Sequence, residues 1–290
     1  MSLIQAILLG LIQGMAEFLP ISSSGHLVIL KNIFQLKTDT DKVYDIMLHL
    51  GTLIAVFVVY WKDIKELIIE GFCILGGWCT NAGRFIANRF RGNNSRKAYK
   101  SVINTPYRRF VLMIILSTIP TGILGLLLEK LVGVASTKLL LPGCCLLVTA
   151  GLLALADHIG GGRKTEKTAT YKDSLFVGTV QGIATLPGIS RSGSTIVACM
   201  LCGFEKEFAV KYSFIMSIPA ILGAVVLEIP KLGSLTSPFA YYITGMVVAG
   251  VVGFLCIKFM LVLIKKNKFT IFSIYCLCAG ILAIVGYFVM

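Results

Sequence analysis

QGMAEFLPISSSGH, residues 13–26, lies between two apolar runs at 3–11 and 27–30. Each run is well short of the ~20 apolar residues that a membrane-spanning helix needs. The stretch nevertheless carries Glu17 and His26, two ionisable residues that are costly in a membrane unless they line a cavity or meet a partner. A proline and a glycine in the same stretch favour a turn. We therefore predict a re-entrant helical hairpin whose polar tip lies near the middle of a membrane.

The composition is typical of a polytopic membrane protein. Of the 290 residues, 56% are hydrophobic and only 14% are charged, whereas a soluble domain carries about a quarter charged residues. The net charge of +13 does not indicate a nucleic-acid partner, because loop lysines and arginines first set membrane orientation. The nine cysteines lie mostly in apolar runs, and the CxxC at Cys199 and Cys202 has no second pair. We therefore expect packing residues rather than disulfides or a metal site.

Six further segments are long and apolar enough to cross a membrane: Val43–Trp61, Phe110–Leu128, Leu139–Ala156, Phe208–Ile229, Phe239–Ile264 and Phe269–Val289. A second stretch with short arms, 174–203, has the polar tip LPGISRSGST at 186–195 and predicts a second hairpin. Residues 62–109 form the longest non-spanning region, in which 67–78 is apolar enough to lie at the membrane surface. The expected fold is a single all-α integral membrane domain, 1–290, with about ten helices: six full spans plus two re-entrant hairpins.

The two hairpins resemble each other in sequence. Residues 10–25 read GLIQGMAEFLPISSSG, and residues 178–193 read GTVQGIATLPGISRSG. The pairs that match 168 residues apart include Gln13 and Gln181, Gly14 and Gly182, Ala16 and Ala184, Ser22 and Ser190, Ser24 and Ser192, and Gly25 and Gly193. This ordered set indicates an internal repeat. We predict a first repeat at about 1–136 and a second at about 174–290, joined by a linking span at about 138–158.

The distribution of basic residues predicts the orientation of the repeats. Region 62–109 holds ten lysines and arginines, loop 160–172 holds four and 265–268 holds three, so these regions should be cytoplasmic. The predicted outer loops 129–138 and 230–238 together hold three. An odd number of spans separates the hairpins, so the second is inverted relative to the first. Inverted repeats with broken helices that meet at the midplane form binding sites inside membranes.

Polar residues gather at the two predicted tips. The first tip supplies Glu17, Ser22, Ser23, Ser24 and His26, and the second supplies Ser190, Arg191, Ser192, Ser194 and Thr195. Arginine has a planar fork that suits phosphate oxygens, and glycine- and serine-rich turns that open helices present free backbone N–H groups to anions. A serine near a histidine and a carboxylate can be a nucleophile with its base. The set suits a phosphorylated ligand, and it suits phosphoryl transfer better than simple binding.

Each of these residues also has a structural interpretation. Glu17 would be interfacial if the first arm lay on the membrane surface, His26 could cap the turn, and Arg191 could tie a helix C-terminus. Two of the three consecutive serines could serve only backbone groups at helix ends. Asp45 and His49 lie four apart on one helical face, where a structural pair explains them as well as a catalytic role.

The motifs QGMAEFLPISSSGH and LPGISRSGST resemble the two signature motifs of the undecaprenyl pyrophosphate phosphatase family, the bacitracin-resistance type. The resemblance covers nearly the whole chain, including YDIMLHLGTLIAV at 44–56. It implies a ten-helix fold with interlocked inverted repeats in the bacterial cell membrane. It also implies hydrolysis of the C55 lipid pyrophosphate to the monophosphate and inorganic phosphate. That reaction recycles the lipid carrier for peptidoglycan synthesis and confers bacitracin resistance.

The residues and the resemblance together define a candidate site. We expect catalytic roles for Glu17, Ser23, His26 and Arg191, and phosphate binding by Gln13, Ser22, Ser24, Gly25, Ser190, Ser192, Gly193, Ser194 and Thr195. Ser23 as the attacking serine rests on the resemblance, and attack by His26 stays open. Because Gln13 stands where the family pattern has Glu or Gln, Glu17 is the single motif acid and the candidate metal ligand. A divalent cation, Mg²⁺ or Ca²⁺, is expected because hard cations neutralise pyrophosphate oxygens.

A transporter is the alternative function, since inverted repeats with broken helices are also transporter architecture. It would move a phosphorylated lipid or anion through the same midplane site. A carrier needs an anion site but no serine–histidine pair, so the residues favour the enzyme. A purely structural membrane protein leaves Glu17 and Arg191 unexplained. We expect the site to open to the outer face, from which the first hairpin enters. The sequence leaves homodimer formation, chain-length preference and the identity of the cation open.

Overall fold

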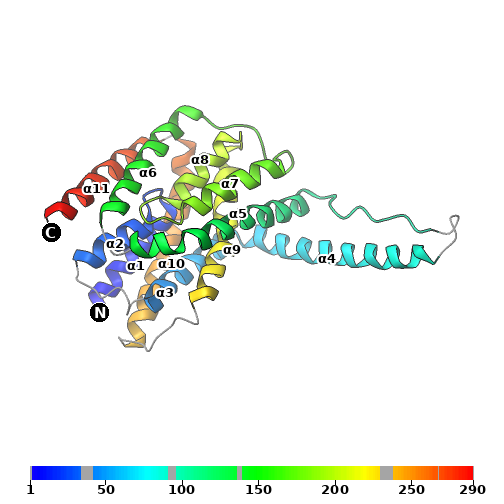
Figure 1. The fold of residues 1–290 in the computed structure, drawn as a ribbon, viewed down its shortest axis with the longest axis horizontal. Helices are drawn as coiled ribbons and strands as arrows, with labels where there is room; N and C mark the ends of the chain where they lie inside the picture. Colours follow the sequence, from blue (N-terminus) through cyan, green and yellow to red (C-terminus); the bar gives the residue numbers. More distant parts are fainter. Residues whose placement is uncertain are drawn as a thin grey trace.

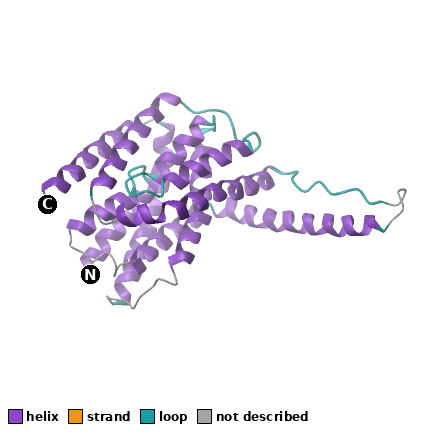
Figure 2. Cartoon of the chain, in the orientation of Figure 1, coloured by secondary structure: helices purple, strands orange, loops and turns teal. Residues whose placement is uncertain are grey.

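The computed structural model describes residues 2–33, 42–90, 96–135, 139–228, 238–266 and 268–289, and within these ranges it contains eleven α-helices and no β-strand (Figures 1 and 2). The helices are α1 (Leu3–Phe18), α2 (Ser23–Ile33), α3 (Lys42–Val59), α4 (Trp61–Arg89), α5 (Pro106–Ala135), α6 (Leu140–Ile159), α7 (Tyr171–Ile183), α8 (Arg191–Leu201), α9 (Lys206–Glu228), α10 (Phe239–Lys265) and α11 (Thr270–Val289). The predicted all-α class is confirmed.

The predicted spans correspond to long apolar helices of the structure. Among the described residues, α5, α6, α9, α10 and α11 are each long and apolar enough to cross a membrane, and α3 with α4 forms a sixth, bent candidate. Large apolar side chains remain exposed on the outward faces of these helices, for example Leu127 on α5 and Leu255 on α10. Such faces suit contact with lipid chains. Parts of the predicted outer loops, 136–138 and 229–237, lie outside the described residues.

Helix α4 extends the prediction for region 62–109, whose non-spanning position stays a prediction. We expected a non-spanning region with a short apolar piece at 67–78, whereas the structure has one continuous helix of 29 residues. Helix α4 meets α3 at 88° and extends well beyond the helical body (Figure 1). Its length has a local cause, because its polar face bonds to the returning segment 96–105 along most of the helix.

Both predicted hairpins are present as pairs of short helices. Helix α1 ends at Phe18, and Leu19 takes an extended backbone because Pro20 follows it. The chain then turns and begins α2 at Ser23. Helices α7 and α8 form the second hairpin, in which the Ser190 hydroxyl caps α8 by accepting a hydrogen bond from the Gly193 N–H at 3.1 Å.

Each hairpin packs against a long helix from the other half of the chain. Helix α1 packs most extensively on α10, and α7 packs most extensively on α5. The repeat-equivalent glycines Gly10 and Gly178 lie at these crossings. A Cβ at Gly10 would lie 2.7 Å from the carbonyl oxygen of Gly245, and one at Gly178 would lie 2.2 Å from that of Ser117. The two halves therefore interlock. The exact repeat boundaries and the inverted orientation stay predictions.

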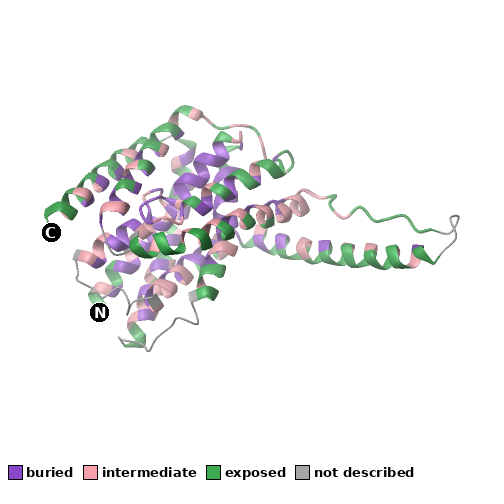
Figure 3. Cartoon of the chain, viewed as in Figure 1, coloured by how far each residue is buried: buried purple, intermediate pink, exposed green. Residues whose placement is uncertain are grey.

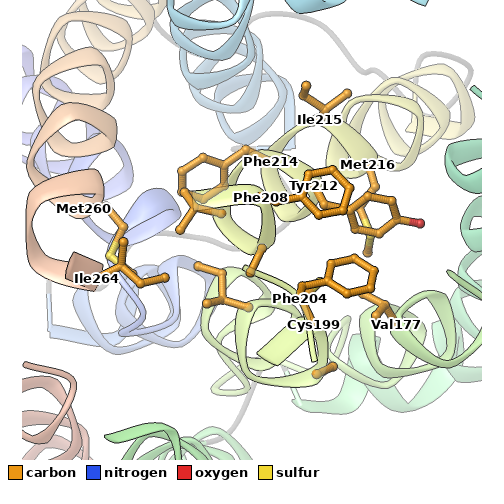
Figure 4. Close-up of a cluster of buried hydrophobic side chains, with 14 of the residues drawn as sticks. Val177, Cys199, Phe204, Phe208, Tyr212, Phe214, Ile215, Met216, Met260 and Ile264 are labelled. Atoms are coloured by element: carbon orange, nitrogen blue, oxygen red, sulfur yellow. The ribbon is translucent and has the colours of Figure 1, made fainter. Parts of the chain in front are cut away.

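The largest buried cluster surrounds α8 and α9. Phe204, Phe208 and Tyr212 form an aromatic group with ring centroids 5.0 to 5.9 Å apart (Figure 4). The Tyr212 hydroxyl donates a hydrogen bond of 3.0 Å to the carbonyl oxygen of Met113, which joins α9 to α5. Helix α8 is buried on nearly all sides (Figure 3). A helix of 11 residues is too short to span a membrane. Because α8 is enclosed by other helices of the protein, a re-entrant position inside the membrane is compatible with its length.

The close crossing of α7 and α5 gives a first prediction. Gly178→Ala should destabilise the folded protein by ~1–3 kcal/mol, because the new methyl group would overlap the Ser117 carbonyl group and force the helices apart. The measurement is the midpoint of thermal unfolding of the purified protein in detergent. Gly151→Ala is the matched control, because a Cβ at that helical position would meet no atom within 4 Å. Equal midpoints for the two variants would contradict the crossing.

Candidate active site

The tips of the two hairpins are in direct contact. A Cβ added at Gly25 would lie 2.9 Å from the Cα of Gly188, and one added at Gly193 would lie 3.0 Å from the Pro20 Cβ. Gly188 has φ +98°, a conformation that glycine adopts at little cost. Ser22 also has a positive φ of 69°, which is uncommon for a residue with a side chain. The motif glycines therefore allow two tight turns to meet backbone to backbone.

The carboxylate of Glu17 is the centre of the site. It is buried at the end of α1, and it accepts hydrogen bonds from Gln13 Nε2 at 3.0 Å and from Ser23 Oγ at 2.7 Å, both on Oε2. Its other oxygen, Oε1, forms an ion pair with the Arg191 guanidinium. One carboxylate thus joins α1, α2 and α8. The structure therefore brings together Glu17, Ser23 and Arg191, as the sequence predicted.

Two helix N-termini point into this region of the structure. Ser23 is the first residue of α2, and Arg191 is the first residue of α8. Helix N-termini present backbone N–H groups and a positive dipole end, both of which favour anions. Together with the Arg191 fork, they make a site for an anionic group that is built into the backbone as well as into the side chains.

A cavity of about 450 Å³ adjoins the Glu17 carboxylate. Its polar lining consists of Glu17, Ser23, Ser24, Asp45, His49, Thr121, Gln181, Thr185, Arg191 and Ser192. The rest of the wall is apolar and comes mainly from the last turns of α9, at Ala220 to Val225, and from Val132 on α5. The cavity therefore combines an anion-binding floor with a wall that suits a hydrocarbon chain.

His26 lies apart from the cavity. Its Nδ1 is 2.8 Å from the carbonyl oxygen of Ser22, and its Nε2 is 2.8 Å from the hydroxyl of Tyr275 on α11. The two rings stack, with centroids 5.5 Å apart. Both ring nitrogens are thus engaged within the protein, and no hydrogen bond to Ser23 or Glu17 is present. The structure brings three of the four predicted catalytic residues together and places His26 behind the turn.

Most of the other predicted phosphate-binding residues serve the turns. The Ser22 hydroxyl accepts a hydrogen bond from the Gly25 N–H at 3.3 Å, and Thr195 shares a hydrogen bond of 2.6 Å with Ser213 on α9. Ser24 and Ser192 do line the cavity. The remaining predicted residues lie beside it rather than in its wall: Gln13, Ser22, Gly25, Ser190, Gly193, Ser194 and Thr195.

Several lining residues were not predicted as site residues. Gln181 has a signal in the sequence, because it is the repeat equivalent of Gln13, whereas nothing marks Thr121 in the middle of α5. Asp45 and His49, for which a structural pair was an equal explanation, both line the cavity. Asp45 also forms an ion pair with Lys31 at 2.6 Å, which joins the first hairpin to α3.

The donors around Glu17 fit a divalent cation only in part. Among the residues that the structure describes, no three His, Cys, Asp or Glu side chains are grouped so that they could hold a metal ion. The buried Gln13 carbonyl oxygen, next to Glu17 in the hydrogen-bond network, has no hydrogen-bond partner, and amide oxygens are ligands that hard cations accept. Glu17 and Gln13 therefore fit a cation whose remaining ligands come from a bound phosphate group and water.

The fold and the site define a class of protein: polytopic membrane proteins in which two re-entrant hairpins meet at a buried, ion-paired carboxylate. Comparisons with known proteins narrow this class. Residues 6–282 match the family model described as bacitracin resistance protein BacA, and the chain belongs to that family.

Curated relatives match over nearly their whole length. A protein of Methanosphaera stadtmanae is 38% identical over 285 residues, covering 98% of both chains. One of Methanobrevibacter smithii is 39% identical over 288 residues, covering 99% of this chain and 98% of its own. One of Alkaliphilus metalliredigens is 39% identical over 289 residues, covering 98% of both. All three are named undecaprenyl-diphosphatase.

The pairing of Glu17 with Arg191 gives a second prediction. Arg191→Ala should destabilise the protein by ~3–5 kcal/mol, because it leaves a buried carboxylate without its counter-charge. Adding Glu17→Gln to Arg191→Ala should restore much of that loss, so the two changes should be strongly non-additive. Thermal unfolding in detergent measures both.

The Lys265–Glu207 ion pair is the control for this cycle. Its two side chains are 60% and 58% exposed, so Lys265→Ala should change the unfolding midpoint little. Losses at Glu17 and Arg191 that simply add would show that the two residues act independently.

Proposed function

We propose that this protein hydrolyses undecaprenyl pyrophosphate to undecaprenyl phosphate and inorganic phosphate. The observation that carries the proposal is the 2.7 Å hydrogen bond from Ser23 Oγ to the buried Glu17 carboxylate, with Arg191 beside it at the floor of the cavity. Family membership over residues 6–282 supports the same activity. In a cell, the reaction would return the lipid carrier to peptidoglycan synthesis and counteract bacitracin.

The cavity suits the two chemically different parts of this substrate. The pyrophosphate would lie against Arg191 and the N-termini of α2 and α8, where positive charge and N–H groups gather. The polyprenyl chain would leave along the apolar wall of α9 toward the lipid. Arg191 has five N–H donors in a planar fork, so it can bind phosphate oxygens while it turns from Glu17. Substrate binding would thereby free Glu17 to act as a base.

Ser23 is the proposed nucleophile. Its Oγ would attack the terminal phosphorus while Glu17 takes the hydroxyl proton. The bond between the terminal phosphorus and the bridging oxygen breaks, and undecaprenyl phosphate leaves with that oxygen. Glu17 gives its proton to the departing undecaprenyl phosphate, and the free carboxylate then deprotonates a water molecule that attacks the phosphoserine. The phosphorus–Oγ bond breaks, Ser23 Oγ takes the proton back from Glu17, and inorganic phosphate is released. Backbone N–H groups and Arg191 stabilise the charge that develops on the phosphoryl oxygens.

His26 has a positioning role in this scheme. Both of its ring nitrogens are engaged, by the Ser22 carbonyl oxygen and by Tyr275, so it holds the strained residue that directly precedes Ser23. The Ser23 hydroxyl faces Glu17 instead of His26. This arrangement favours the serine over the histidine as the attacking group.

A divalent cation, Mg²⁺ or Ca²⁺, is proposed as a partner of the substrate. Glu17 and Gln13 are the residues that would hold it, together with pyrophosphate oxygens. When bound, such an ion neutralises negative charge on the phosphates. The steps assigned above to Ser23, Glu17 and Arg191 are the contributions of the chain itself.

Transport of a phosphorylated lipid is the less favoured function. The anion site alone would serve a carrier equally well. A carrier gains nothing, however, from a serine hydroxyl bonded to a buried carboxylate, and the curated relatives are named as phosphatases.

The site is proposed to open to the outer face of the cell membrane. Its lining residues lie near the beginning of α3 and near the ends of α5 and α9, and the segments that follow α5 and α9 have few basic residues. The opposite ends of these helices adjoin the strongly basic region 62–109 and the loop 160–172, which favour the cytoplasm. The inverted orientation of the hairpins is part of this proposal.

The assignment of Ser23 gives a third prediction. Ser23→Ala and Glu17→Gln should each lower phosphate release from a polyprenyl pyrophosphate by roughly 10³-fold or more, and the double variant should be hardly slower than either single one. Arg191→Lys should restore little activity relative to Arg191→Ala, because a lysine lacks the bidentate fork.

Two further variants discriminate among the groups near the turn. Ser24→Ala is the matched control, since Ser24 lines the same cavity without a bond to Glu17, and its loss should be much smaller. His26→Gln should also lose less than Ser23→Ala. A Ser23→Ala variant with near-normal activity beside an inactive His26→Gln variant would assign the attack to the histidine.

The proposed sidedness gives a fourth prediction. Sealed right-side-out vesicles should release phosphate from a membrane-impermeant, short-chain pyrophosphate substrate added outside. Permeabilised vesicles measure the total activity, and vesicles that contain Ser23→Ala measure the background. Release only after permeabilisation would show that the site opens inward.

A further inference from the structure

Helix α4 and the returning segment 96–105 form an arm that leaves the helical body (Figure 1). The two parts are joined by side chains of α4 that bond to the backbone of the segment. Asn81 and Asn88 each make two such bonds, at 2.8 to 2.9 Å, to Lys100 and Lys97, and Arg84 donates one of 2.6 Å to the carbonyl oxygen of Ala98. Nearer the body, Arg108 binds Glu70 at 2.5 Å. The arm is therefore an ordered structure.

The two faces of α4 differ sharply. The face that carries Asn81, Arg84 and Asn88 is covered by the returning segment. Outside that face, large apolar side chains are exposed along the arm: Ile68, Phe72, Leu75, Trp78, Phe85, Ile86 and, directly after the helix, Phe90. Phe72 is 70% exposed and Phe90 is 85% exposed. Figure 3 shows that most of the length of α4 is exposed. A continuous apolar stripe of this size needs a partner.

Beyond Glu70, the charged residues of the arm are all basic. Residues 71–109 contain eight lysines and arginines and no aspartate or glutamate. Of these, Arg89, Arg96, Lys97 and Lys100 are exposed near the outer end of the arm. A surface that combines bare apolar side chains with unbalanced positive charge is complementary to anionic lipid headgroups above a hydrocarbon layer.

The direction of the arm favours the surrounding membrane as the partner that covers the apolar side chains of α4. Helix α3 corresponds to the predicted span Val43–Trp61, and α4 leaves its end at 88° after one residue, Tyr60. A helix perpendicular to a spanning helix runs along the membrane surface instead of away from it. The arm begins where α3 ends and returns where α5 begins, so both of its attachments are at the same membrane face.

We propose that the arm is a membrane-surface anchor that binds anionic lipid. The apolar stripe of α4 inserts among the acyl chains next to the headgroups, and the basic side chains at the end of the arm contact the lipid phosphates. The occupant of the stripe is the bilayer in which the protein is embedded. A protein partner with an acidic face would suit the basic residues, but it would leave the row of phenylalanines and isoleucines unexplained.

The two tryptophans of the chain allow a direct test. Both Trp61 and Trp78 lie on α4, and Trp61→Phe leaves Trp78 as a single reporter on the arm. The full-length protein is reconstituted in phosphatidylcholine vesicles with or without phosphatidylglycerol. Lipids brominated near the headgroup should quench Trp78 emission by more than half in the anionic vesicles and clearly less in the neutral ones. Iodide in the buffer should have little effect on the anionic sample.

Charge variants test the lipid contact separately. Replacement of Arg89, Arg96, Lys97 and Lys100 by glutamine should lower the quenching in anionic vesicles to the level in neutral vesicles. The matched control replaces Arg163, Lys167 and Lys172 by glutamine, three exposed basic residues of the loop at 160–172. This control should leave the quenching unchanged. Equal quenching in both kinds of vesicle, or an equal loss in the control, would overturn the headgroup contact.

Two other outcomes would overturn insertion itself. Quenching of Trp78 by iodide but not by brominated lipid would mean that the arm extends into water. Protection from both quenchers, together with a disulfide between Cys79 residues of two copies, would mean that the stripe pairs with a second copy of this chain. Cys79 is exposed on α4 next to Trp78, so such a bond could form.

Discussion

The ion pair between Glu17 and Arg191 is the interaction on which the site depends. Each charge alone would be costly at the depth of the hairpin tips, and together they are tolerated because the partners neutralise each other. The pair also fixes the position of Ser23, because the hydroxyl of Ser23 bonds to the carboxylate oxygen that Arg191 leaves free. The pair thus joins the two hairpins, and it keeps the proposed nucleophile and the proposed phosphate-binding group within one network.

The sequence predicts much of this fold because membrane physics leaves few options. An apolar run long enough to cross the bilayer must form a helix, and a short apolar run with a buried charge must return. Five candidate spans, a sixth bent candidate and both hairpins follow from these rules. The length of α4 does not, since its polar face is stabilised by a segment about 15 residues further along the chain. The sequence of α4 alone does not predict its contact with that segment.

The candidate site, like the fold, was only partly predictable from the sequence. Glu17, Ser23 and Arg191 could be found from the sequence because charged and hydroxyl residues are rare in apolar arms. The direction of each side chain could not be found. His26 is only three residues from Ser23, yet it turns to Tyr275, more than 240 residues away in sequence. Thr121 and Gln181 reach the cavity through helix packing that no local pattern encodes.

The exchange of packing between the two halves has a consequence for the biogenesis of the protein. Helix α1 emerges from the ribosome before α10, which forms its main packing surface and follows it by more than 200 residues. The carboxylate at the end of α1 likewise meets its arginine only after α8 has been made. Until then the first hairpin has no protein surface to cover its polar tip, and lipid cannot replace one. The packing surface of α1 and the ion pair of Glu17 can therefore form only after α10 and α8 have been synthesised.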